Sequence, residues 1–152
     1  MSLSQDVKAI KKRILGIEPP EHFGNKDIVR SFFGAFLFGL TFVFKGLIFK
    51  VSEKLTEYHL MLIIITTITI LTAEIYFIGY SRVENKRARK FGQFWIKRIV
   101  TFYVIAAITT LLLVNIYGLN AGLTDFEELQ LIIAISLPCA VGAGLADLLK
   151  QY

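Results

Sequence analysis

Four long, almost uncharged runs of residues constrain the fold of this chain more than any other feature. They cover roughly residues 31–49, 59–81, 99–117 and 129–149. A helix that crosses a bilayer needs about 20 mainly apolar residues. Because lipid cannot satisfy exposed backbone N–H and C=O groups, runs of this length are expected to be helical. We therefore predict an all-α, polytopic membrane protein with four transmembrane helices.

The first run contains one cation, Lys45, whose position must be compatible with a span. The uncharged residues from Ser31 to Phe44 extend about 21 Å at the helical rise of about 1.5 Å per residue. Lys45 can therefore lie near the far membrane interface and extend its ammonium group into water, while Gly46–Phe49 complete the span.

Most of the 17 Lys and Arg residues fall on one side of the predicted membrane. They precede the first run, separate the second run from the third, or follow the fourth, whereas the loop between the third and fourth runs is acidic. Because cationic loops stay in the cytoplasm, this pattern predicts a multi-pass cell-membrane protein with both termini cytoplasmic. A cationic cytoplasmic face then accounts for the net charge of +5. Because the charge needs no further explanation, we expect no nucleic-acid partner.

Two basic segments outside the spans are candidates for contact with lipid. Residues 1–24 are expected to form a cytoplasmic amphipathic arm ahead of the transmembrane domain at 25–152, because apolar residues from Val7 to Ile17 recur at helical spacing opposite basic ones. The arm lies either on the anionic inner leaflet or on the protein's own loops. In the second segment, basic residues either bind anionic lipid headgroups or only set the topology. They are Lys86, Arg87, Arg89 and Lys90.

Glu74 is the one charged residue between Leu60 and Ser81. The stretch Leu60–Ala73 extends only about 21 Å, which is short for a hydrocarbon core of about 30 Å, so Glu74 falls within the predicted bilayer. An acid at this depth is costly and usually faces the bundle interior or a wet cavity. In the alternative, the helix is shifted and Glu74 reaches the inner headgroups beside Tyr76 and Tyr80.

The same helix is rich in threonine, with Thr66, Thr67, Thr69 and Thr72 before Glu74. Thr67 and Glu74 share one helical face because they are seven residues apart. Threonine hydroxyls in lipid often bond back to carbonyls of their own helix. The alternative is that Thr67 and Thr72 belong to a polar path that leads to Glu74.

The fourth run carries a second acid, Asp147, one turn before its predicted cytoplasmic end. An interfacial position near Lys150 is the favoured interpretation, and ion binding together with Glu74 is the other. Seven small or helix-perturbing residues of the first and fourth runs are predicted to pack helices closely. They are Gly34, Ala35, Gly39, Pro138, Ala140, Gly142 and Gly144.

Four short spans scarcely enclose a solute path, so we expect a homo-oligomer in the lipid bilayer, with the glycine faces of the first and fourth helices as candidate contacts. The single cysteine, Cys139, excludes an internal disulfide framework and a cysteine-based zinc cluster. No hydrolase, metalloprotease or nucleotide-binding motif is present, so the sequence predicts neither an enzyme nor a cofactor or metal site.

The stretches "RSFFGAFLFGLTFVF", "LTAEIYFIGY" and "LPCAVGAGLADLL" together resemble a family of small integral membrane proteins, mainly archaeal and cyanobacterial. The matching features are a Gly-rich first span, a Thr-x-Glu near the end of the next and a Pro-then-Gly last span. The chain departs from the pattern at Thr41, where the family has proline. The resemblance covers most of residues 30–149 and implies a membrane location, but it does not decide the activity.

Two functional hypotheses follow from the sequence. The first is a small oligomeric channel or transporter for protons or cations, in which Glu74 binds or relays charge with help from threonine hydroxyls and Asp147; an acid in the span favours cations over anions. The second is a non-transporting membrane subunit or scaffold. Its basic cytoplasmic face would bind lipid or a protein partner, and Glu74 would bond to another helix.

Overall fold

The computed structural model describes residues 24–79 and 91–149, and every regular element in these two ranges is helical. The predicted N-terminal arm, apart from Gly24, and the candidate headgroup residues Lys86, Arg87, Arg89 and Lys90 lie outside the described residues. The elements are α2 (Asn25–Lys45), α3 (Leu47–Ser52), α4 (Glu57–Glu74), the π-helical turn η1 (Ile75–Gly79), α5 (Phe91–Ile116) and α6 (Asp125–Leu148).

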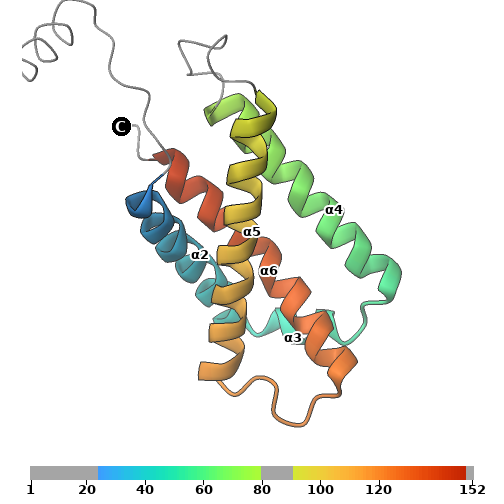
Figure 1. Cartoon of the computed structure of the whole chain (residues 1–152). Coiled ribbons are helices and arrows are strands. Elements are labelled where there is room, and N and C mark those ends of the chain that lie inside the picture. The colour runs from blue at the N-terminus through green and yellow to red at the C-terminus, as the bar shows by residue number, and fades with distance from the viewer. Residues whose placement is uncertain (1–23, 80–90, 150–152) are drawn as a thin grey trace, which may run out of the picture.

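Helix α6 is the centre of the bundle. In Figure 1 it runs between α2 and α4, and α5 crosses it. It packs against α2, α5 and α4, whereas α4 has few contacts with α5. Accordingly, 61% of the apolar window of α6 is buried, against 22% for α4. Helix α4 therefore packs mainly against α6, and its buried residues, Leu60, Thr67 and Leu71, form one narrow stripe.

The long helices alternate in direction, so the bundle has two distinct ends. At one end, α2 and α5 begin and α4 and α6 finish; we call this the Asp147 end. At the other, α2 and α5 finish and α4 and α6 begin; we call this the Thr124 end. The short helix α3 lies across the Thr124 end (Figure 1).

Four helices of the described part are long and apolar enough to cross a membrane, as the sequence predicts. They are Asn25–Lys45, Glu57–Phe77, Trp95–Ile116 and Asp125–Asp147. The first differs from the prediction at its end, because α2 finishes at Lys45 and Gly46–Phe49 do not continue it. Gly46 takes a left-handed conformation with φ of 67°, which glycine adopts without a Cβ penalty and which commonly ends a helix.

The outer surface of the bundle is apolar on all four long helices. Large side chains stand out from α2 at Phe33 and Leu37, from α4 at Met61 and Ile65, and from α5 at Val104. Soluble monomers rarely expose continuous apolar surface on this scale. In lipid the same surface needs no cover, so the exposure pattern agrees with the hydropathy of the four helices.

The small residues of α2 and α6 meet each other inside the bundle. A Cβ placed on Gly142 would lie 2.5 Å from the carbonyl oxygen of Gly34, and one placed on Gly39 would lie 2.5 Å from Sγ of Cys139. Ala35 and Ala140 are also buried. The atoms nearest to Gly34, Gly39 and Gly142 thus belong to other helices of the same chain. The expected homo-oligomer stays a prediction.

Polar caps fix where two of the helices begin. The Thr124 side chain accepts from the Glu127 N–H at 3.4 Å, and the Thr124 N–H donates to Oε2 of Glu127 at 2.8 Å. This reciprocal pair is a capping box at the start of α6. Thr56 is the N-cap residue of α4, and its N–H donates to Nδ1 of His59 at 3.3 Å.

Replacing the cap of α6 should weaken the bundle measurably. Thr124→Ala leaves the Glu127 N–H without its side-chain acceptor, and loss of such a cap typically costs about 1 kcal/mol. Thr101→Ala is the matched control, because its exposed hydroxyl bonds only to Lys97 O within α5. Thermal unfolding in detergent should show a lower midpoint for Thr124→Ala and little change for Thr101→Ala. Equal midpoints would contradict the role of the cap.

Candidate functional site

Glu74, the last residue of α4, points its carboxylate at the backbone of α6. Oxygen Oε2 is buried, and within residues 24–79 and 91–149 it has no hydrogen-bond partner. It occupies the space beside Gly144, where any Cβ would collide with it. The buried oxygen of the carboxylate therefore lies between α4 and α6. A Cβ at position 144 would have to displace the end of the Glu74 side chain.

The backbone changes form immediately after Glu74. Residues Ile75–Gly79 form a π-helical turn, η1, in which hydrogen bonds span one residue more than in an α-helix. Leu71 and Ile75, on either side of Glu74, are fully buried. Short π segments are rare and occur frequently at functional sites. The turn widens α4 where its acid enters the bundle.

The threonines of α4 do not form a continuous row beside Glu74. Thr67, Thr69 and Thr72 each donate to a carbonyl one turn earlier in their own helix, at 2.7 to 2.8 Å. Thr69 is exposed, and Thr72 accepts a hydrogen bond from Nε1 of Trp95 in α5 at 2.9 Å. Thr67 alone is fully buried on the Glu74 face, where its side chain lies near the Tyr103 hydroxyl of α5.

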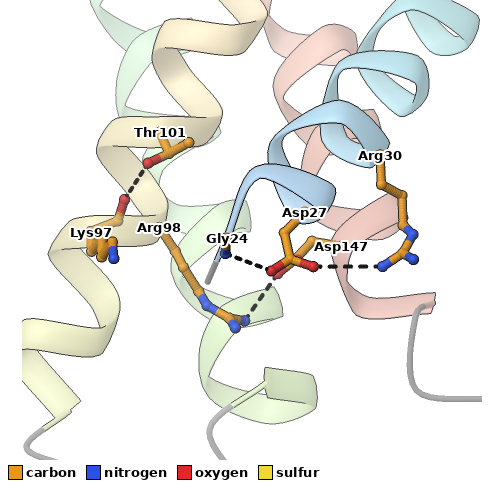
Figure 2. Close-up of polar contacts among 7 residues, drawn as sticks. All are labelled: Gly24, Asp27, Arg30, Lys97, Arg98, Thr101 and Asp147. Atoms are coloured by element: carbon orange, nitrogen blue, oxygen red, sulfur yellow. Dashed lines mark hydrogen bonds and ion pairs between the residues drawn. The ribbon is translucent and has the colours of Figure 1, made fainter. Parts of the chain in front are cut away.

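Asp147, the second predicted acid, is buried and paired with a cation of another helix. Its side chain is 3% exposed, and its Oδ2 lies 3.0 Å from Nη1 of Arg98 in α5, whose side chain is 13% exposed. Figure 2 shows the two side chains meeting across the gap between α5 and α6. The interfacial position near Lys150 stays a prediction, because Lys150 lies outside the described residues. Arg98 was visible in the sequence only as one of many basic residues.

A further acid, Asp27, lies at the start of α2 at the same end of the bundle. It is buried, accepts the Gly24 N–H at 2.9 Å and lies 3.7 Å from Arg30 (Figure 2). An acid in the first turn stabilises a helix N-terminus, which explains its position on α2. We refer to Asp27, Arg30, Arg98 and Asp147 as the ionic cluster. It brings together side chains of α2, α5 and α6 at the Asp147 end.

Contacts between helices place Glu74 about one turn from the ionic cluster. Along α5, Trp95 meets Thr72 and Tyr103 lies near Thr67, so α4 and α5 run antiparallel with Arg98 between these two levels. Along α6, Glu74 is level with Gly144, three residues before Asp147. Side chains three residues apart on a helix are neighbours, with Cβ atoms about 5–6 Å apart.

Pro138 is buried within α6, which continues through it from Asp125 to Leu148. Because proline has no N–H, the carbonyl of Ala134 lacks its usual donor one turn ahead. Nearby, the Ser136 hydroxyl donates to Ile133 O at 2.8 Å, and Thr110 of α5 faces the thiol of Cys139. These polar atoms lie farther from the Asp147 end than Glu74 does.

The four apolar helices, their lipid-compatible surface and the intramembrane acid together define a polytopic helical membrane protein. Residues 21–149 match the family model described as "Putative integral membrane protein (DUF2391)". Since the match spans most of the chain, the protein belongs to this family. Among curated proteins no match is found, and among solved structures there is none either.

Proposed function

We propose that the protein carries protons across the membrane, with Glu74 as the group that gains and loses the proton. The observation that supports this most is the buried, unpartnered Oε2 of Glu74 between α4 and α6. A carboxylate left without a partner in a low-dielectric site is costly. Such a group relieves the cost by taking up a proton, so its charge can change during a transport cycle.

A proton suits this site better than a metal cation. Within the described ranges no group of three or more His, Cys, Asp or Glu side chains is placed to hold a metal ion. Calcium takes six to eight oxygen ligands and magnesium about six. Glu74 offers one carboxylate in a space that excludes even the Cβ of an alanine at position 144. A proton needs only the carboxylate oxygen.

The proposal includes the orientation and assembly expected from the sequence. Both termini and the Asp147 end would face the cytoplasm of the cell membrane, with the basic loop of Lys86, Arg87, Arg89 and Lys90 near anionic headgroups. A homo-oligomer would be held by the outward faces of the helices, since the glycine faces are filled within the chain. No enzymatic step and no cofactor form part of the proposal.

The test is proton flux into vesicles that contain the purified protein and a trapped pH-sensitive dye. A potassium gradient with valinomycin supplies the driving potential. Glu74→Gln keeps the shape of the side chain but cannot ionise, so we expect flux to fall about tenfold or more, to the level of empty vesicles. Glu53→Gln is the matched control, because Glu53 is exposed at the Thr124 end, and its flux should equal that of the unsubstituted protein.

Normal flux in a folded Glu74→Gln variant would contradict the proposal. So would an absence of flux from the unsubstituted protein. The second result would favour the membrane subunit or scaffold hypothesis. The Arg98–Asp147 pair, which joins α5 to α6 by charge, gives that alternative its structural support.

A further inference from the structure

We propose that Arg98 is a counterion shared by Asp147 and Glu74. Arg98 pairs with Asp147 while Glu74 is protonated and turns toward Glu74 when that carboxyl ionises. The inference rests on the proposed function in one respect, because Glu74 is the group whose charge changes. It assigns Arg98 as a positioning residue, which links the charge of α4 to the contact between α5 and α6.

The positions of α4, α5 and α6 support this exchange of Arg98 between Asp147 and Glu74. Arg98 lies on α5 between Trp95, which bonds to Thr72, and Tyr103, which lies near Thr67. Its backbone is therefore level with α4 between Thr67 and Thr72, less than two turns before Glu74. Its guanidinium already reaches α6, where Nη1 is 3.0 Å from Oδ2 of Asp147.

The two carboxylates are close enough for one side chain to serve both. Glu74 lies against Gly144, and Asp147 is one turn farther along the same helix. Positions three apart on a helix have Cβ atoms about 5–6 Å apart. Arginine carries five N–H donors in a planar fork on a long side chain. A small change in side-chain torsions thus moves the guanidinium from one acid toward the other.

Among the residues that the structure describes, Arg98 is the cation placed to respond when Glu74 changes its charge. On α6 the nearest ionisable group to Glu74 is Asp147, and on α5 the facing groups are Arg98 and Tyr103. Lys97 neighbours Arg98 on α5 but is exposed. On α2, Asp27 and Arg30 pair with each other at 3.7 Å. An ionised Glu74 in this setting attracts Arg98 strongly, because the charges interact in a medium of low dielectric.

The exchange is tested by a cycle of substitutions read by thermal unfolding in detergent, under alkaline conditions in which exposed carboxyl groups are ionised. Asp147→Asn removes the competing acid, so Arg98 should pair with Glu74. We expect Glu74→Gln to lower the unfolding midpoint by several degrees more in the Asp147→Asn background than in the unsubstituted protein. Equal effects in the two backgrounds would overturn the inference.

Arg98 must itself carry the coupling. When Arg98→Gln is added to Asp147→Asn, the extra lowering of the unfolding midpoint by Glu74→Gln should disappear. When Arg98→Lys is added instead, part of this extra lowering should return. If Arg98 had only a structural role, its loss would lower the unfolding midpoint of every variant. The effect of Glu74→Gln would still be larger in the Asp147→Asn background than in the unsubstituted protein. Persistence of the difference in the absence of Arg98 would therefore also overturn the inference.

A second measurement needs no change at Asp147 and covers the case in which Asp147→Asn does not fold. Infrared difference spectra identify the guanidinium bands of Arg98 through the Arg98→Lys variant. Raising the pH should shift these bands in the unsubstituted protein and leave them unchanged in Glu74→Gln. Bands that move equally in both proteins, or in neither, would overturn the exchange.

These readouts separate the inference from the proposed function, because none of them measures flux. If the effect of Glu74→Gln depends on Asp147 and Arg98 but the protein shows no proton flux, Arg98 is a shared counterion in a protein that does not transport protons. In that case the proposed function alone fails. Glu74-dependent flux without coupling leaves the proposed function intact, and the inference alone fails.

Discussion

Gly142→Leu should prevent the bundle from forming, and Gly142→Ala should already destabilise it strongly. A Cβ at position 142 would lie 2.5 Å from the carbonyl oxygen of Gly34 and 2.8 Å from Cβ of Phe38. The first of these is a backbone atom, so α2 must move away from α6 as a whole. Overpacking of a well-filled core typically costs about 1–3 kcal/mol. We expect Gly142→Ala at or above the upper end of this range.

The measurement is the unfolding midpoint in detergent, together with the yield of monodisperse protein. Gly92→Ala is the matched control, because Gly92 is exposed at the start of α5 and a Cβ there meets nothing within 4 Å. Alanine favours a helix over glycine by at most about 1 kcal/mol, so this control should unfold at the same temperature or slightly above. An unchanged midpoint for Gly142→Ala would show that α2 and α6 are not in close contact.

The sequence predicted the four helices well because their determinants are local. Hydropathy over about 20 residues sets a span, and Thr124 with Glu127 sets the start of α6 through atoms three residues apart. The end of α2 could not be predicted from hydropathy. Apolar residues continue to Phe49, but the left-handed conformation at Gly46 ends the helix first. Hydropathy does not report a backbone torsion.

The site was predicted less completely, because its contacts join residues distant in sequence. Glu74 was identified from its depth, and the shared face with Thr67 followed from helical periodicity. That Arg98 pairs with Asp147 depends on how α5 and α6 rotate about their axes, and no local pattern encodes this. The same applies to Gly144. The sequence marked it as one of several small packing residues, whereas its neighbour in the structure is the carboxylate of Glu74.

Arg98→Met should be the most damaging substitution of a charged residue in the described part of the chain. It leaves Asp147, whose side chain is 3% exposed, without its partner at 3.0 Å. Breaking a buried pair from one side typically costs about 3–5 kcal/mol, because a buried charge is left uncompensated. Replacing both members with Arg98→Met and Asp147→Leu removes both charges. The double variant should therefore recover most of the loss in an unfolding experiment.

Asp147→Leu alone should cost less than Arg98→Met alone, and the difference follows from the shared counterion. Without Asp147, Arg98 can pair with Glu74, whereas without Arg98 the buried Asp147 carboxylate loses its ion pair at 3.0 Å. Arg30→Met is the matched control, since Arg30 is 41% exposed and 3.7 Å from Asp27, and pairs of this kind contribute about 1 kcal/mol or less. A double variant as unstable as Arg98→Met would show that Arg98 stabilises the bundle through packing of its side chain, and that its charge contributes little.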